Sequence, residues 1–158
     1  PPRARATLRG VPVPAGWDVH GGSLLVWRHL APAPSAKVAA FDFDGCLAKT
    51  PLGGTEHDWK MQFAHVPAVL ASLLASGHTL AVVTNESMDR LKKPEAIAGC
   101  IRKKCGRLER FAAAAGVPLL VLCNKVRGGA RPCMPPSQRP PPPLASSSAQ
   151  EHSAGLTG

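Results

Sequence analysis

Short apolar runs alternate with helix-like segments along the middle of the chain. Four runs are predicted to be strands, at Ser23–Trp27, Val38–Phe43, Thr79–Thr84 and Leu119–Cys123. The third run is almost continuously apolar, which is typical of strands that a parallel sheet buries on both faces. Strands that alternate with helices predict an α/β fold, with an open parallel sheet and right-handed crossovers.

Two segments between these runs have the spacing of amphipathic helices. The first spans Val66–Ser76 and places five apolar residues on one face, namely Val66, Val69, Leu70, Leu73 and Leu74. The second begins at Pro94, reaches Ala115 and stops at Gly116. Proline near a helix start and glycine just after a helix end are common boundary signals. The pattern therefore predicts one helix between the second and third strands and one between the third and fourth.

The two ends of the chain have a different composition from the middle. Residues 1–22 are rich in Pro, Gly and Arg, and we expect them to be disordered or loosely packed. Residues 127–158 are rich in Pro and Ser and hold too few large apolar side chains to offset chain entropy, which predicts a disordered tail. Between these two segments we expect one folded domain, at residues 23–126. Because the sequence begins at Pro1 rather than at methionine, we expect a fragment.

The net charge of +9 is concentrated in one segment. Between Arg90 and Arg110 lie eight basic residues and only two acids. Such a patch attracts phosphate backbones, and the attraction weakens with salt. A solvated helix face carries the same pattern, so charge alone does not decide between these readings.

The five cysteines are scattered and include no Cys-x-x-Cys pair. An odd, scattered set of this kind predicts reduced thiols rather than a disulfide framework or a zinc site. No apolar run approaches the ~18 residues of a membrane span, so we do not expect one.

The most informative polar pattern follows the second strand. Asp42 and Asp44 lie one residue apart, with Gly45 directly after them. Side chains alternate along a strand, so both carboxylates are expected to point the same way from the end of a buried strand. Two carboxylates this close repel unless a cation or a shared proton offsets them. The arrangement suits Mg²⁺-assisted phosphoryl transfer with an aspartate nucleophile. A calcium-binding loop would continue with spaced oxygen ligands and lie between two helices. The sequence around Asp42 and Asp44 does neither, which argues against a calcium site.

A second polar element follows the third strand. Thr84 and Asn85 stand at its carboxyl end, where ligands of open α/β sheets bind. A hydroxyl at this position can donate to a phosphoryl oxygen. We therefore expect Thr84 to lie beside the paired aspartates.

Together these elements resemble a known family. The chain is similar to the phosphatase domain of polynucleotide kinase 3′-phosphatases, especially plant-type DNA 3′-phosphatases, in the haloacid dehalogenase superfamily. Cys46 replaces the threonine that is commonest in the superfamily, but it agrees with the plant type. The resemblance covers roughly residues 23–123 and is carried by Lys37–Thr50 (KVAAFDFDGCLAKT), Trp59, His65–Pro67, Thr84–Ser87 (TNES) and Lys104–Phe111 (KCGRLERF).

The resemblance implies a haloacid-dehalogenase-like fold, a mechanism and a substrate. Asp42 would attack phosphorus and bind Mg²⁺, while Asp44 would serve as acid and base and offer its backbone carbonyl to the metal. Thr84, Asn85 and Gly45 would hold the phosphoryl group. The substrate would be DNA with 3′-phosphate ends, which implies strand-break repair and a nuclear location. The residues expected to guide the DNA backbone are Arg90, Lys92, Lys93, Arg102, Lys103, Lys104 and Arg107.

The chain also departs from the family pattern. The resemblance implies a lysine in an Arg-Lys-Pro context and a later acidic element that completes Mg²⁺ coordination. Neither is present: Arg131-Pro132 lacks the lysine, Lys125 has different neighbours, and no aspartate follows Asp89. We therefore expect a domain that is incomplete at its C-terminal side, and a chain that is weakly active or inactive.

Two other functions stay open. The first is a phosphatase of the same superfamily that acts on a small phosphate ester, and the second is a non-catalytic nucleic-acid-binding remnant. No Gly-x-x-x-x-Gly-Lys-Ser/Thr loop occurs in the sequence, so no kinase activity is expected.

Overall fold

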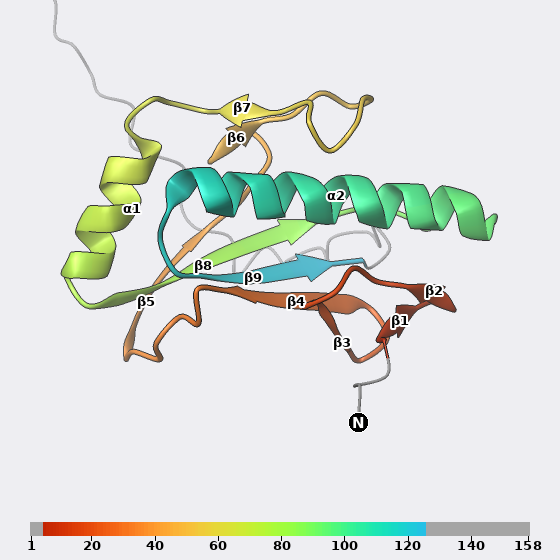
Figure 1. Cartoon of the computed structure of the whole chain (residues 1–158), viewed down its shortest axis with the longest axis horizontal. Coiled ribbons are helices and arrows are strands. Elements are labelled where there is room, and N and C mark those ends of the chain that lie inside the picture. Colours follow the sequence, from red (N-terminus) through yellow and green to blue (C-terminus); the bar gives the residue numbers. More distant parts are fainter. Residues whose placement is uncertain (1–4, 126–158) are drawn as a thin grey trace, which may run out of the picture.

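A mixed five-stranded sheet organises residues 5–125, the part of the chain that the computed structural model describes (Figure 1). The predicted Pro/Ser-rich tail lies outside these residues. The order across the sheet is β3-β4-β9-β8-β5. The strands are β3 (Asp18–His20), β4 (Leu24–His29), β5 (Lys37–Phe41), β8 (His78–Asn85) and β9 (Leu119–Asn124).

The four predicted strands are confirmed as β4, β5, β8 and β9, but the prediction of a wholly parallel sheet is wrong. β5, β8 and β9 are parallel, whereas β4 pairs antiparallel with β9, and β3 pairs antiparallel with β4. A turn that contains Gly21 and Gly22 joins β3 to β4, and both glycines have positive φ. A connection this short can only join antiparallel neighbours, because parallel strands need a long crossover.

Both predicted helices are confirmed. α1 spans Val66–Ala75 and leads into β8, while α2 spans Pro94–Ala115 and links β8 to β9. α2 is continuous and ends at Gly116, whose φ of 66° is in the left-handed region that favours glycine. Figure 1 shows both helices on the same side of the sheet, where they bury its apolar face. No helix among residues 5–125 is long and apolar enough to span a membrane.

β5 does not lie in the middle of the sheet, as a buried strand would. It is one of the two edge strands among the described residues, and Val38 is 60% exposed. One face of β5 is covered, since its alternate residues Ala39 and Phe41 pack against the hydrophobic core. The next residue of that series, Phe43, is completely buried and meets the ring of Phe111 edge-on at 5.5 Å. Phe43 thus anchors the end of β5 against α2.

The N-terminal segment is folded, so the expectation of a loosely packed segment is wrong for residues 5–22. β1 (Thr7–Leu8) and β2 (Val11–Pro12) form a hairpin that packs beside α2. Its apolar residues are single positions between Pro, Gly and Arg, and the core buries Leu8, Val11, Val13 and Trp17. This burial supplies the stabilisation that composition alone did not indicate.

A second small hairpin lies beside the end of β5. β6 (Ala48–Lys49) pairs with β7 (Lys60–Met61), and residues 50–59 form the loop between them. We call residues 50–59 the flap. Arg107 of α2 donates hydrogen bonds to three carbonyls of the flap and so holds it.

Candidate active site

The carboxyl ends of β5 and β8 bring the predicted acid and hydroxyl together. The two strands are parallel, with Phe41 opposite Val82, so the residues that follow Phe41 lie near Thr84. The Thr84 Oγ1 donates to Asp44 Oδ2 across 3.4 Å, and Thr84 is only 1% exposed. The predicted meeting of Thr84 with the paired aspartates is therefore confirmed for Asp44. Asn85 follows at the same edge and is exposed.

Asp42 and Asp44 flank the buried Phe43. Both aspartates are exposed, whereas Phe43 is completely buried between them. The Asp42 Oδ1 accepts a hydrogen bond of 2.7 Å from the backbone N–H of Phe43. Phe43 thus takes the position that faces the core, and the Asp42 side chain beside it is left open to a ligand.

Gly45 makes the turn that the sequence predicted. Its φ is 80°, and its N–H donates to the carbonyl of Ala48 at 2.8 Å. The N–H groups of Leu47 and Ala48 both donate to the carbonyl of Phe43, at 3.1 and 3.0 Å. The left-handed conformation explains the glycine. Its role in phosphate binding stays a prediction.

Three side chains hold the Asp44 carboxylate. Lys104 Nζ and Thr84 Oγ1 donate to Oδ2, while Thr50 Oγ1 in the flap donates to Oδ1 at 2.6 Å. Partial burial raises the pKa of the Asp44 carboxyl. The hydrogen bonds from Lys104, Thr50 and Thr84 outweigh burial and hold this pKa below its ordinary value. Asp44 is therefore ionised and fixed in the free chain.

Lys104 lies inside the site rather than on the DNA-facing surface. Its side chain is 2% exposed, and its Nζ contacts Asp44 and lies 3.6 Å from Glu86 Oε2. The ammonium also lies 5.3 Å from the centre of the Phe43 ring. The prediction that Lys104 contacts the DNA backbone is wrong, because the ammonium is enclosed and bound to carboxylates of the chain itself.

The helical phase of α2 could have revealed this position. Lys104 follows Ile101 by three residues and precedes Leu108 by four, so it lies on the buried stripe of the helix. Its charge instead places it among the basic residues that surround it in the sequence. Glu86 was likewise overlooked, although it follows the Thr84-Asn85 element directly.

Arg107 is also buried, and it fastens the flap. Its guanidinium donates from Nε to the carbonyl of Thr55 at 3.0 Å, from Nη1 to Pro51 at 3.2 Å and from Nη2 to Gly53 at 2.8 Å. Arg107 is 5% exposed, so the prediction that it binds DNA is wrong as well. The other predicted DNA-binding residues stay accessible, with Lys103 partly exposed and Arg90, Lys92, Lys93 and Arg102 exposed. Their contact with DNA stays a prediction.

The oxygen atoms at the site fit a magnesium ion only in part. Among residues 5–125, no group of three or more His, Cys, Asp or Glu side chains could hold a metal. Mg²⁺, however, usually binds one or two carboxylates and completes its shell with water and substrate phosphate. The exposed Asp42 carboxylate and the backbone carbonyl of Asp44 are oxygen donors of that kind. The side chain of Asp44 is already engaged by Lys104, Thr50 and Thr84.

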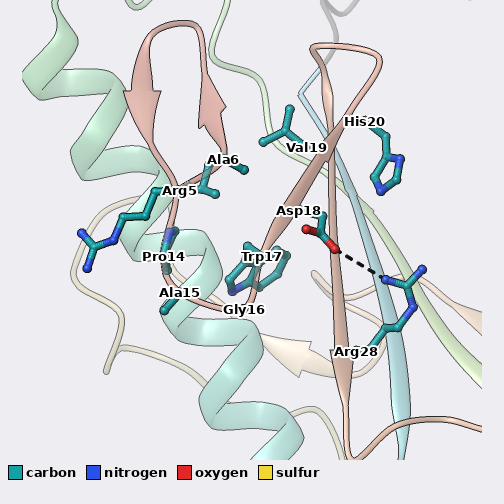
Figure 2. Close-up of a pocket in the computed structure, with 11 residues that line it drawn as sticks. Arg5, Ala6, Pro14, Ala15, Gly16, Trp17, Asp18, Val19, His20 and Arg28 are labelled. Atoms are coloured by element: carbon teal, nitrogen blue, oxygen red, sulfur yellow. Dashed lines mark ion pairs between the residues drawn. The ribbon is translucent and has the colours of Figure 1, made fainter. Parts of the chain in front are cut away.

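Two of the hollows among residues 5–125 differ in their relation to Asp44. A cavity of about 470 Å³ borders the flap and includes Thr50 and Trp59, so it adjoins the Asp44 network. A larger cavity of about 860 Å³ lies along β3, β4 and the N-terminal segment. Figure 2 shows Trp17 in its wall and the ion pair between Asp18 and Arg28, which spans 3.7 Å. None of the catalytic residues predicted from the sequence lines this larger cavity.

Comparison with known proteins agrees with this geometry. Residues 37–134, more than half of the chain, match the family described as Polynucleotide kinase 3 phosphatase. The polynucleotide 3′-phosphatase ZDP of Arabidopsis thaliana is 43% identical over 89 residues, which are 55% of this chain and 12% of that relative. The chain thus spans a small part of the curated relative that it matches. The matched family region contains Asp42, Asp44, Thr84 and Lys104, and the chain belongs to the polynucleotide kinase 3 phosphatase family.

Proposed function

We propose that this chain is a polynucleotide 3′-phosphatase that removes the 3′-phosphate from DNA strand-break ends. Family membership supports the reaction class. The observation that carries the proposal is the convergence of Asp44, Thr84 and Lys104 at the end of β5, next to the exposed Asp42. A strand that bears the nucleophile beside a strand that bears the hydroxyl also favours a haloacid-dehalogenase-like catalytic domain.

In the first half of the reaction, an oxygen of the Asp42 carboxylate attacks phosphorus. The bond from phosphorus to the 3′ oxygen of deoxyribose breaks, and Asp44 gives that oxygen a proton. The negative charge of the arriving phosphate raises the pKa of Asp44, which favours the protonated acid at this stage. Asp42 is left as an aspartyl-phosphate, and the DNA leaves with a free 3′-hydroxyl group.

In the second half, Asp44 takes a proton from a water molecule, and the water oxygen attacks the phosphorus of the aspartyl-phosphate. The bond between Asp42 and phosphorus breaks, which releases inorganic phosphate and restores both carboxyl groups. Thr84 Oγ1 lies 3.4 Å from Asp44 Oδ2, so its hydroxyl can donate to a phosphoryl oxygen held beside that carboxylate. Asp42 and the carbonyl of Asp44 would hold Mg²⁺, which when bound offsets the charge of the phosphoryl group.

The accessible basic residues support DNA as the substrate. Arg90, Lys92 and Lys93 lie in the loop between β8 and α2, which begins at the carboxyl edge of the sheet, where Thr84 stands. Arg9 in the β1–β2 turn holds this loop, since its guanidinium donates to the carbonyls of Met88 at 3.0 Å and Leu91 at 3.1 Å. A DNA strand that reaches the site would thus meet positive side chains on a fixed loop. Action on DNA breaks would place the protein in the nucleus.

The test is phosphate release from a 3′-phosphorylated oligonucleotide, with Mg²⁺ and with a chelator. We expect Mg²⁺-dependent release that Asp42→Asn abolishes and that Asp89→Asn, an exposed acid outside the site, leaves intact. Faster turnover of a small phosphate ester than of the oligonucleotide would favour the small-ester phosphatase. Oligonucleotide binding without release would favour a non-catalytic remnant.

A further inference from the structure

We infer that Lys104 is a positioning residue of the phosphatase site, which orients the Asp44 carboxylate and supplies a buried positive charge for the phosphoryl group. The inference rests on the proposed function. It assigns a role to a residue that belongs, by sequence, to a basic surface.

Burying a lysine at position 104 of α2 costs free energy. The stripe that faces the sheet is otherwise apolar, with Ile101 and Leu108 one turn away on either side. Transferring an ammonium group from water into such a position costs several kcal/mol, and buried ion pairs are often matched or exceeded in stability by apolar residues. Methionine would fill the same space without a buried charge. Fold stability alone therefore does not explain why a lysine stands here.

The contacts of Lys104 aim it at Asp44. Lys104 is 2% exposed, whereas the Asp44 side chain is 40% exposed, so the ammonium depends on this pair far more than the carboxylate does. One carboxylate oxygen is held from the flap by Thr50, and the other is held by Lys104 together with a longer contact to Thr84. Without Lys104, that second oxygen would keep only the Thr84 contact, and the carboxylate could rotate away from the substrate.

The charge of Lys104 is also placed to meet a phosphate. An ammonium group has three donors. Among residues 5–125 its carboxylate partners are Asp44 and Glu86, with Glu86 Oε2 at 3.6 Å. One donor is left for a phosphoryl oxygen that enters between Asp44 and Thr84. The two carboxylates otherwise repel an anion, and the lysine lowers that repulsion.

The first experiment compares two leaving groups in Lys104→Met. The variant should stay folded, because it keeps the volume of the side chain and because water can reach the Asp44 carboxylate, which is 40% exposed. Its first-turnover rate on a 3′-phosphorylated oligonucleotide should fall about 100-fold, the scale of general acid catalysis. Its first-turnover rate on p-nitrophenyl phosphate should fall by about tenfold or less, because nitrophenolate leaves without a proton from a correctly placed Asp44. Lys104→Arg should recover part of the oligonucleotide rate.

Lys37→Met is the matched control, because Lys37 is exposed at the start of β5 and takes no part in the site. It should leave both rates unchanged. Equal losses on the two substrates in Lys104→Met, or no loss on either, would overturn the inference. If Lys104→Met does not fold, Lys104→Arg takes its place: a selective loss on the oligonucleotide supports the inference, and equal or no losses overturn it.

A second measurement does not require turnover. Orthophosphate binding, followed by ³¹P NMR, should weaken about tenfold in Lys104→Met, since one charge-assisted hydrogen bond to the anion is lost. Lys37→Met should bind as the wild type does. Wild-type affinity in Lys104→Met would overturn the inference and leave an Asp42-dependent phosphatase intact. A wild-type chain that neither binds orthophosphate nor releases phosphate would overturn the proposed function, and the inference with it.

Discussion

Arg107→Met should release the flap from α2 and destabilise the fold. The buried guanidinium makes three hydrogen bonds to backbone carbonyls of Pro51, Gly53 and Thr55, at 2.8–3.2 Å. Hydrogen bonds from charged groups contribute about 1.5–3 kcal/mol each when both partners are desolvated. Here the three residues that accept the bonds are exposed and can bind water after the change. We therefore expect a net loss of about 2–3 kcal/mol, which is less than three fully desolvated bonds of this kind would contribute.

Urea unfolding followed by tryptophan fluorescence measures this loss. A second readout is tryptic cleavage after Lys49 and Lys60, which lie at the two ends of the flap and should be cut faster once it detaches. Phosphatase activity should fall as well, because Thr50 adjoins the fastened segment and bonds Asp44 at 2.6 Å. Arg102→Met, an exposed arginine of the same helix, should change stability by less than about 0.5 kcal/mol. A loss in Arg107→Met as small as that of the control, with unchanged cleavage, would refute Arg107 as the anchor of the flap.

Three further predictions concern the rest of the molecule. Trp17→Phe should lower stability by about 1.5 kcal/mol in urea unfolding, because its Nε1–H donates to Glu109 Oε1 at 2.6 Å; an unchanged midpoint would argue against this bond. At pH 8, a maleimide should label Cys46 in the native protein, since it is exposed, and mass spectrometry identifies the labelled peptide. Burial raises the pKa of the other thiols in residues 5–125, which are Cys100, Cys105 and Cys123. Rapid labelling of any of these three in the native protein would contradict the fold. Lys92→Gln should lower the salt slope of oligonucleotide binding by about 1; equal slopes for the wild type and Lys92→Gln would remove Lys92 from the interface.

The positions of the main strands and helices could be predicted from the sequence because periodic apolar patterns determine them locally. The meeting of Asp44 with Thr84 could also be predicted, since parallel neighbouring strands end at one sheet edge. The N-terminal hairpin could not be predicted in this way. Leu8 and Val11 are single apolar residues in a Pro- and Gly-rich segment, and they are buried only because α2 and the sheet cover them. The antiparallel direction of β4 likewise depends on its pairing with β9, which is distant in sequence.

The site residues that the sequence analysis misassigned share one cause. Lys104 and Arg107 were grouped with their basic neighbours by charge, although only the helical phase decides which of these side chains face the sheet. The phase places Lys104 on the buried stripe. The flap contacts of Arg107 depend on backbone carbonyls, which no pattern of side chains reveals. Charge density therefore identified basic residues of this segment that are accessible. It did not reveal that Lys104 and Arg107 are buried in contacts within the fold.

The central claim is that Asp42 is the nucleophile of a phosphatase, and trapping the intermediate tests it most directly. The protein is mixed with a 3′-phosphorylated oligonucleotide and Mg²⁺, quenched in acid within the first turnover and digested with trypsin. The peptide Val38–Lys49, which contains Asp42, should gain the mass of one phosphoryl group in the wild type and none in Asp42→Asn. Phosphate release at the wild-type rate by Asp42→Asn, with no phosphorylated peptide in either protein, would contradict the account.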